Sequence, residues 1–292
     1  MTLLAVKWYE YAGQEDAWRA FWHDLCLYLP IRPAPSFFEG PTARLWETGA
    51  YDLTWACGGD VALNPRQFCP LAVPVFGPAA TDPGTYQSLI LRLKKAEDRQ
   101  TQDQRPEDPR PKDPRPKDFK TKDLKPPKRR IGINGPLSTS GHLALAHWWH
   151  GQGYAAPQQV IITGGHEASV QALLAQQIDM AAIDSQGWHL LQRAYPALAH
   201  RVTVEAKTRI LPAPPLCIPG HQSVSQSVSQ SGQAQAWRDG FAAANRALQN
   251  GELHDHGLGI TGFVPAKDQA YKDLALELKK QISAGQVLCQ VP

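Results

Sequence analysis

The chain has 292 residues, which fits one large domain or two lobes, and its 42% hydrophobic content is enough for a substantial core. The net charge is only +3, and residues 94–130 carry 14 Lys/Arg against 8 Asp/Glu, so the rest of the chain is slightly acidic. Because the basic character belongs to one segment, we expect no nucleic-acid partner. No apolar run is long enough to cross a bilayer, so we expect a protein that is not membrane-embedded.

Strand and helix patterns alternate almost from the first residue. In chain order, we predict strands at 3–9, 51–57, 68–76, 86–93, 130–134, 159–164, 179–184 and 202–208. The predicted helices are 15–29, 43–49, 140–153, 166–177, 185–201, 234–252 and 266–282, the last two forming a helical tail from about residue 233. This alternation favours an α/β architecture with mainly parallel strands.

Two segments have low complexity. From Asp98 to Asp123 an aspartate recurs every five residues, and Asp-Pro-Arg-Pro-Lys occurs twice in tandem. Proline, charge and the lack of apolar residues exclude a core there, so we predict a disordered, solvated insert at about 96–128, with a basic partner-binding tail as the alternative. Residues 221–233, rich in Ser and Gln, are interpreted as a second, shorter expansion in a loop.

The cysteines and histidines give no metal-ligand pattern. None of the five cysteines forms a CxxC pair, and Cys57 and Cys69 either pair across a short connection or remain free thiols. His147 with His150, and His254 with His256, have no supporting ligands around them, so we expect no metal. No nucleotide-binding glycine pattern occurs, so we expect no cofactor.

The stretch 134–141 combines a strand end with three hydroxyls. Ser138, Thr139 and Ser140 precede Gly141 and an apolar helix, which places hydroxyl donors and unpaired backbone N–H groups at the positive end of that helix. Such a turn is typical of an oxyanion site. The alternative is that one of these residues simply caps the helix.

A second strand-to-helix turn repeats this arrangement at 163–185. Gly164 and Gly165 follow a strand, His166 opens the next helix, and Asp184 ends the next strand. In open parallel sheets this strand edge is where ligands lie, so His166 is a candidate donor to an oxyanion. Asp184 would then meet a cationic part of the ligand or accept a ligand proton. The alternatives are a solvated histidine and an aspartate that only caps a helix.

Taken together, these stretches resemble the phosphate/phosphite/phosphonate substrate-binding proteins of ABC importers. The resemblance is strongest over 163–216 and extends to the Ser-Thr-Ser turn, the strand that ends in Cys57-Gly58, and the crossover segment 82–92. It implies a two-lobed, type II periplasmic-binding-protein fold, each lobe a mainly parallel sheet flanked by helices, with a cleft between the lobes. Gly59 stands where related chains often have an aromatic residue, and the charged insert departs from the family.

Carried over residue by residue, the resemblance implies oxyanion contacts from Ser138, Thr139, Ser140 and His166. It implies aromatic walls from Tyr86 and Tyr9, with Asp184 facing the organic or amino end of the ligand. The expected partners are a small phosphorus oxyanion and the membrane permease of an ABC transporter, and the expected state is a monomer.

The predicted lobes are residues 1–85 plus 206–292, and 86–205. We expect binding of phosphate, phosphite or a phosphonate without catalysis. The alternatives are a sensor of the same fold for another small ligand, and a biosynthetic enzyme on this fold. The resemblance implies a periplasmic protein, whereas residues 1–18 show no signal peptide, so cytoplasmic retention stays open.

Overall fold

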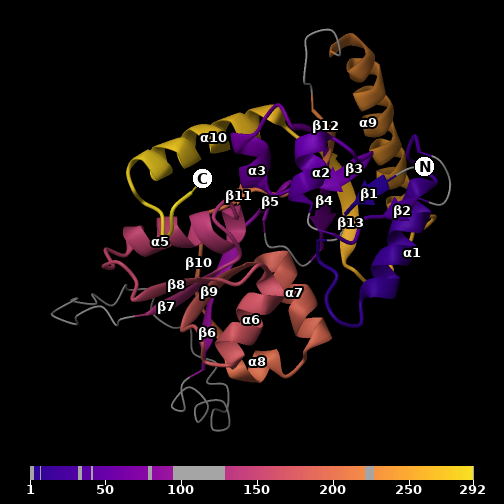
Figure 1. The fold of residues 1–292 in the computed structure, drawn as a ribbon. Helices are drawn as coiled ribbons and strands as arrows, with labels where there is room; N and C mark the ends of the chain where they lie inside the picture. The colour runs from indigo at the N-terminus through magenta and orange to yellow at the C-terminus, as the bar shows by residue number, and fades with distance from the viewer. Residues whose placement is uncertain are drawn as a thin grey trace, which may run out of the picture.

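The structure is a computed structural model that describes residues 3–6, 8–31, 35–40, 42–77, 81–94, 129–220 and 227–291. The chain builds two sheets, each flanked by helices, and they lie one above the other in Figure 1. The two-lobed α/β fold is therefore confirmed. The exact division at residues 85/86 and 205/206 stays a prediction, and the predicted insert at about 96–128 lies outside the described residues.

The first sheet has six strands in the order β13-β4-β12-β3-β1-β2. Their bounds are β1 Leu3–Ala5, β2 Ser36–Phe37, β3 Leu53–Trp55, β4 Phe68–Phe76, β12 Leu216–Pro219 and β13 Ile260–Pro265. The helices of this part are α1 Glu15–Cys26, α2 Ala43–Thr48, α3 Gly58–Leu63, α9 Ser227–Asn250 and α10 Asp268–Ser283.

The second sheet has five strands in the order β10-β6-β9-β7-β8. Their bounds are β6 Ser88–Leu93, β7 Arg130–Ile133, β8 Gln159–Ile162, β9 Met180–Asp184 and β10 Val202–Lys207. The helices are the π-helical η1 Thr139–Leu143, α5 Ala144–Gly151, α6 His166–Leu174, α7 Ser185–Ala194 and α8 Leu198–Arg201. A short antiparallel pair, β5 Thr85–Tyr86 with β11 Leu211–Pro212, lies where the chain crosses between the two sheets.

Both sheets are mixed, but most of their described strands run in one direction, as expected: β1 to β4 in the first sheet and β7 to β10 in the second, with β6, β12 and β13 running the other way. The pairs β1–β2, β1–β3, β7–β8 and β7–β9 are parallel, whereas β6 and β12 pair antiparallel with both of their neighbours. These two strands follow the crossing segments β5 and β11. Each crossing segment enters its sheet at the carboxyl ends of the neighbouring strands. Strands β6 and β12 therefore start where β9 and β3 end, and run opposite to them.

Several predicted elements differ in detail. The predicted strand 86–93 is split between β5 and β6, the helix 140–153 begins as η1, and the helix 185–201 is interrupted at Tyr195–Ala197. Helix α9 begins at Ser227, inside the stretch interpreted as a loop; Ser and Gln carry only a modest penalty in a helix. The tail is not wholly helical, because β13 lies between α9 and α10.

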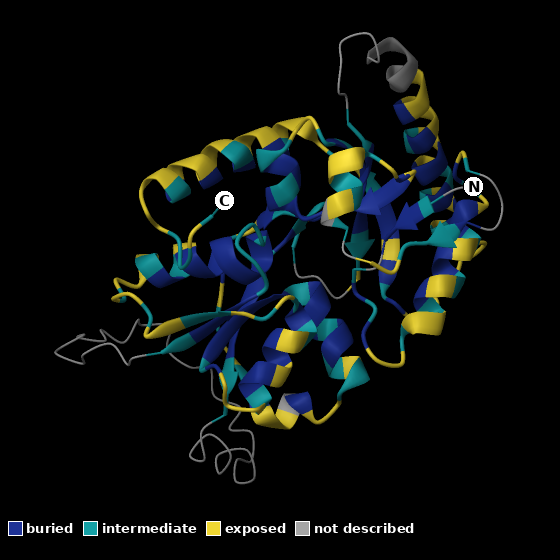
Figure 2. Cartoon of the chain, viewed as in Figure 1, coloured by how far each residue is buried: buried dark blue, intermediate teal, exposed yellow. Residues whose placement is uncertain are grey.

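Alternating side chains bury both faces of the second sheet, as a strand period of two requires. Ile90, Ile131 and Met180 pack with Trp149 of α5, whereas Leu91 and Ile183, which point the other way, pack in the cluster that contains α6 and α7. Dark-blue residues accordingly line the inner faces of these helices in Figure 2. In the first half, Trp18 and Trp22 of α1 pack with Trp55 of β3; all three are almost completely buried and form the aromatic centre of the core.

The C-terminal segment joins the two halves of the molecule. Helix α10 packs on α3 of the first half, while Gln281 on α10 donates from Nε2 to the carbonyl oxygen of Leu143, 2.9 Å away in η1. Further along, the backbone N–H of Leu288 donates to Nε2 of the buried His142 at 3.0 Å. The start of α5 and the η1 turn are therefore held against the first half, close to the crossing strands.

Candidate functional site

The carboxyl ends of β7, β8 and β9 meet at one edge of the second sheet, facing the first half of the molecule. Asn134 follows β7, Gly164 and Gly165 follow β8, and Asp184 ends β9. A cleft of about 680 Å³ opens there, lined from the second half by Ser138, Ser140 and His166 among others, and from the first half by Trp8, Glu10, Tyr11, Cys57 and Asp60. Residues far apart in the sequence thus surround one space between the sheets.

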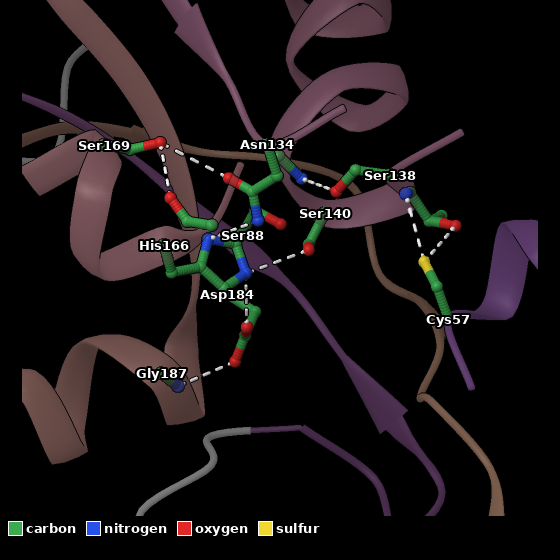
Figure 3. Close-up of polar contacts among 12 residues, drawn as sticks. Cys57, Ser88, Asn134, Ser138, Ser140, His166, Ser169, Asp184 and Gly187 are labelled. Atoms are coloured by element: carbon green, nitrogen blue, oxygen red, sulfur yellow. Dashed lines mark hydrogen bonds and ion pairs between the residues drawn. The ribbon is translucent and has the colours of Figure 1, made fainter. Parts of the chain in front are cut away.

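His166 and Asp184 form a buried pair at the base of this cleft. Nε2 of His166 lies 2.7 Å from Oδ2 of Asp184, and the side chains are only 8% and 3% exposed. The solvated alternative for His166 is therefore wrong. Asp184 also caps α7, because its Oδ1 accepts from the backbone N–H of Gly187 at 2.7 Å. The helix-cap role considered for this aspartate is therefore confirmed (Figure 3), whereas its contact with a ligand stays a prediction.

Ser140 is the second side chain that contacts Nε2 of His166. Its Oγ lies 3.1 Å from Nε2 of His166, and Nδ1 of the ring lies 3.1 Å from the amide nitrogen of Asn134. In a Ser-His-Asp catalytic triad the serine and the aspartate meet opposite ring nitrogens. Here both meet Nε2, so when its proton points to Asp184 no free base remains for Ser140.

The other two hydroxyls of the predicted turn have different partners. Oγ of Ser138 accepts from the N–H of Gly141 at 3.0 Å, so Ser138 caps η1 while lining the cleft. Thr139 is completely buried; its N–H donates to Sγ of Cys57 at 3.3 Å, and its Oγ1 lies 3.3 Å from the same sulfur. Cys57 belongs to the first half, so this contact crosses between the lobes.

Tyr86 and Tyr9 lie next to Asp184, and Tyr86 is also close to Ser140. Together with Asp184 they line a small enclosed cavity of about 30 Å³, large enough for one or two waters. The hydroxyl of Tyr86 is buried and makes no hydrogen bond of normal geometry among the described residues; burial raises its pKa, and the nearby hydroxyl of Ser140 acts in the opposite direction. The seven predicted residues are therefore brought together, six of them lining two adjoining spaces, with Thr139 packed behind.

Charge in this region is concentrated on carboxylates. Burial alone raises the pKa of Asp184, but the charge of His166 and hydrogen bonds from His166, Gly187 and Tyr9 outweigh it, so the net pKa is lowered and the group stays ionised. Burial raises the pKa of Tyr9 and Tyr11, and the Asp184 charge adds to both. Burial also raises the pKa of Asp60, at the start of α3, to about 6. An anion entering the cleft would favour the protonated form of Asp60.

Several residues of this site, Glu10 and Asp60 among them, were not predicted. Asn134 contacts His166, Cys57 contacts Thr139, and Trp8 and Tyr11 line the cleft from the loop after β1. A signal existed for Asn134, since it directly follows a buried strand, and for Cys57, since it precedes two glycines. Nothing in the local pattern around Trp8 or Tyr11 indicated a cleft. Both Cys57 and Cys69 are free thiols.

The described part of the chain has no group of three or more His, Cys, Asp or Glu side chains arranged to hold a metal ion. Within that same part, each helix is too short or too polar to span a bilayer.

Two facing α/β lobes with a polar cleft at the strand ends define a solute-binding protein of the two-lobed type. The sequence profile of the phosphonate periplasmic substrate-binding proteins of ABC transporters matches residues 40–271. This is more than half of the chain, which therefore belongs to that family, whose members are substrate-binding components of transporters and periplasmic in ABC importers. Among curated proteins none matches the chain.

Solved structures support the same fold. The binding-protein component of an ABC phosphonate transporter from Pseudomonas aeruginosa is 16% identical, with a TM-score of 0.63 over 98% of this chain and 88% of that one. PhnD1 from Prochlorococcus marinus, in complex with methylphosphonate, is 13% identical, with a TM-score of 0.65 over 97% and 98%. A Xanthomonas citri protein bound to ATP, also 13% identical, has a TM-score of 0.58 over 97% and 98%. At these identities the likeness concerns the fold alone.

Proposed function

We propose that this chain binds a small phosphorus oxyanion, with a phosphonate as the first candidate, between Ser140, His166 and Tyr86. The observation that carries the proposal is the cluster of donors at the strand edge, where the hydroxyl of Ser140 lies 3.1 Å from Nε2 of His166 and also interacts with the buried hydroxyl of Tyr86. Membership of the phosphonate-binding family supports the ligand class. Hydrogen bonds to a charged group contribute roughly 1.5–3 kcal/mol each, so three such donors offset much of the cost of dehydrating an anion.

Asp184 restricts the chemistry of that ligand. An ionised carboxylate beside a bound dianion is repulsive unless a proton or a cationic group lies between them. A protonated phosphorus oxyanion brings such a proton, and an aminoalkyl phosphonate brings an ammonium group. The enclosed cavity next to Asp184 supports the second case, since it is lined by Asp184 and by the rings of Tyr9 and Tyr86. Sulfate brings neither at neutral pH.

A thermal-shift series on the purified protein tests this. We expect phosphate, phosphite, methylphosphonate or 2-aminoethylphosphonate to raise the melting temperature, because a ligand that binds only the folded state stabilises it by about 2.7 kcal/mol at roughly 100 times its dissociation constant. Sulfate serves as the matched anion and should leave the melting temperature unchanged. An equal shift with sulfate would contradict the role of Asp184, and no shift with any phosphorus oxyanion would contradict the ligand class.

We further propose that the protein acts as a periplasmic monomer that delivers its ligand to the permease of an ABC importer. Family membership supports this role. Fractionation of cells that express the full-length gene tests it. Recovery with periplasmic proteins supports delivery to a transporter, whereas retention in the cytoplasm would favour a sensor of the same fold.

A further inference from the structure

His142 belongs to the same turn as the three hydroxyls, and its ring links that turn to the C-terminal segment 284–291. The residue is completely buried in η1, and its backbone N–H donates to the carbonyl oxygen of Ser138 at 3.0 Å. Its Nδ1 lies 2.8 Å from the carbonyl oxygen of Pro136, which lines the cleft. Its Nε2 accepts from the backbone N–H of Leu288 at 3.0 Å. One side chain therefore bridges the cleft wall and the segment that follows α10.

The two backbone partners fix the protonation state of this ring. A carbonyl oxygen only accepts, so Nδ1 must carry a proton, and a backbone N–H only donates, so Nε2 must be unprotonated. Burial lowers the pKa of His142 and outweighs the opposite effect of the hydrogen bond to Pro136, which favours the same neutral form. The thiol of Cys289 lies 4.0 Å from Nε2, and burial raises its pKa, so it is neutral as well. A second proton on Nε2 would face the N–H of Leu288 and break that contact.

The segment 284–291 is anchored on both halves of the molecule. Gly285, in the left-handed region at φ +66°, ends α10, and the chain then turns back toward α5 (Figure 1). Gln281 of α10 holds this turn, because its Nε2 donates to the carbonyl oxygens of Leu143 and Gln286, each at 2.9 Å. Two side chains of the segment pack in the cluster shared by α3, α10 and the crossing strands, and two pack in the cluster around α5: Val287 and Val291, and Leu288 and Cys289.

We propose that His142 is a positioning residue of the anion site, through which the C-terminal segment 284–291 latches the Ser138–Ser140 turn in its binding conformation. The effect on ligand binding rests on the proposed function, whereas the latch itself does not. Without the N–H of Leu288, the ring loses one of its two fixed partners, and the loop that carries Pro136 loses its support. The donors of the turn must then be ordered when the ligand binds, and that ordering lowers the affinity.

A pair of variants at Leu288 isolates the latch. Leu288→Pro removes the donor N–H without changing any residue of the cleft, and Leu288→Ala, which keeps that N–H, is the matched control. Amide hydrogen exchange of the unliganded proteins gives the first readout. Residues 135–145 should exchange about tenfold faster in Leu288→Pro than in Leu288→Ala, while residues 166–174 of α6 exchange equally in both. Equal exchange of residues 135–145 in the two variants would overturn the latch.

Titration with methylphosphonate gives the second readout. Leu288→Pro should bind it about tenfold more weakly than Leu288→Ala, the effect of losing about one hydrogen bond. Faster exchange in Leu288→Pro, together with a parent protein that does not bind methylphosphonate, would overturn the proposed function and leave the latch standing. Equal affinity of the two variants, beside a parent that binds, would overturn the positioning role.

A measurement on the parent protein alone covers the case in which Leu288→Pro does not fold. In ¹⁵N-labelled protein at pH 7, a scalar coupling across the hydrogen bond should join the amide nitrogen of Leu288 to an unprotonated histidine ring nitrogen. That coupling shows directly that Nε2 of His142 accepts from the C-terminal segment. A protonated Nε2, or an amide of Leu288 without such a coupling, would overturn the latch.

Discussion

His166→Ala should destabilise the protein by about 3–5 kcal/mol at pH 7, the cost expected when one partner of a buried charged pair is removed. Asp184 would remain as a carboxylate that is 2% exposed, with only the N–H of Gly187 and the hydroxyl of Tyr9 as donors. Denaturant unfolding of the two proteins measures the difference. Glu277→Gln, which breaks the exposed Arg209–Glu277 pair, is the matched control and should cost under about 1 kcal/mol.

The pH dependence separates this charge effect from a simple loss of packing. In the parent the folded pKa of Asp184 is lowered, so its contribution to stability is present above the unfolded value of about 3.9 and is lost as pH falls through the lower folded pKa. Without His166, burial dominates and the pKa rises above the unfolded value. The carboxyl is then protonated at mildly acidic pH, so the deficit of His166→Ala should shrink between pH 7 and pH 4.5. The same deficit at both values would contradict a charge effect.

Gly59→Ala should weaken phosphonate binding on the order of 100-fold. A Cβ at this position would lie 2.5 Å from the carbonyl oxygen of Leu137 and 2.7 Å from Oγ1 of Thr139, both across the cleft in the second half. Relieving such overlaps costs about 1–3 kcal/mol, and here the lobes must separate to do so, because one of the two atoms is backbone. Small-angle scattering should show a more open unliganded protein, and calorimetry the loss of affinity.

A weakened α3 helix would not explain a loss of phosphonate affinity in Gly59→Ala. Gly59 lies in the first turn of α3, where alanine is a better helix former than glycine by about 1 kcal/mol. Gly135→Ala is the matched control, since Gly135 also lines the cleft but a Cβ there would meet no atom within 4 Å. If Gly59→Ala binds phosphonate and scatters like the parent, the close approach of α3 to the η1 turn is not required when the two lobes close on the ligand.

The second sheet was predictable because its strands and helices alternate with clear boundaries. The predicted strand 179–184 corresponds to β9, which ends at Asp184. This aspartate caps the next helix, and both the strand end and the cap are visible in the local sequence. The missed strands β12 and β13 contain Pro219, Gly262 and Pro265, residues that disfavour strands on local grounds. Their hydrogen bonds to β4, supplied by tertiary pairing, outweigh that preference.

The sequence predicted which turns form the candidate site, but not which atoms contact each other within it. A strand-to-helix turn with hydroxyls and glycines marks an anion-binding edge, and that pattern located Ser140 and His166. It carries no information on the partner of each ring nitrogen, because Asn134 and Asp184 reach His166 from separate strand ends. The role of Gly59 likewise depends on the opposite lobe, which no local pattern describes.

The dissociation constant of methylphosphonate, measured by titration calorimetry on the parent and on Ser140→Ala, tests the central claim most directly. Oγ of Ser140 is the hydroxyl next to Nε2 of His166, and losing one hydrogen bond to a charged ligand should weaken binding about tenfold. Ser283→Ala, at the end of α10 away from the cleft, is the matched control and should bind like the parent. Measurable binding by the parent with a tenfold loss in Ser140→Ala is the predicted result. Equal affinity in all three proteins would place the ligand elsewhere and contradict the account.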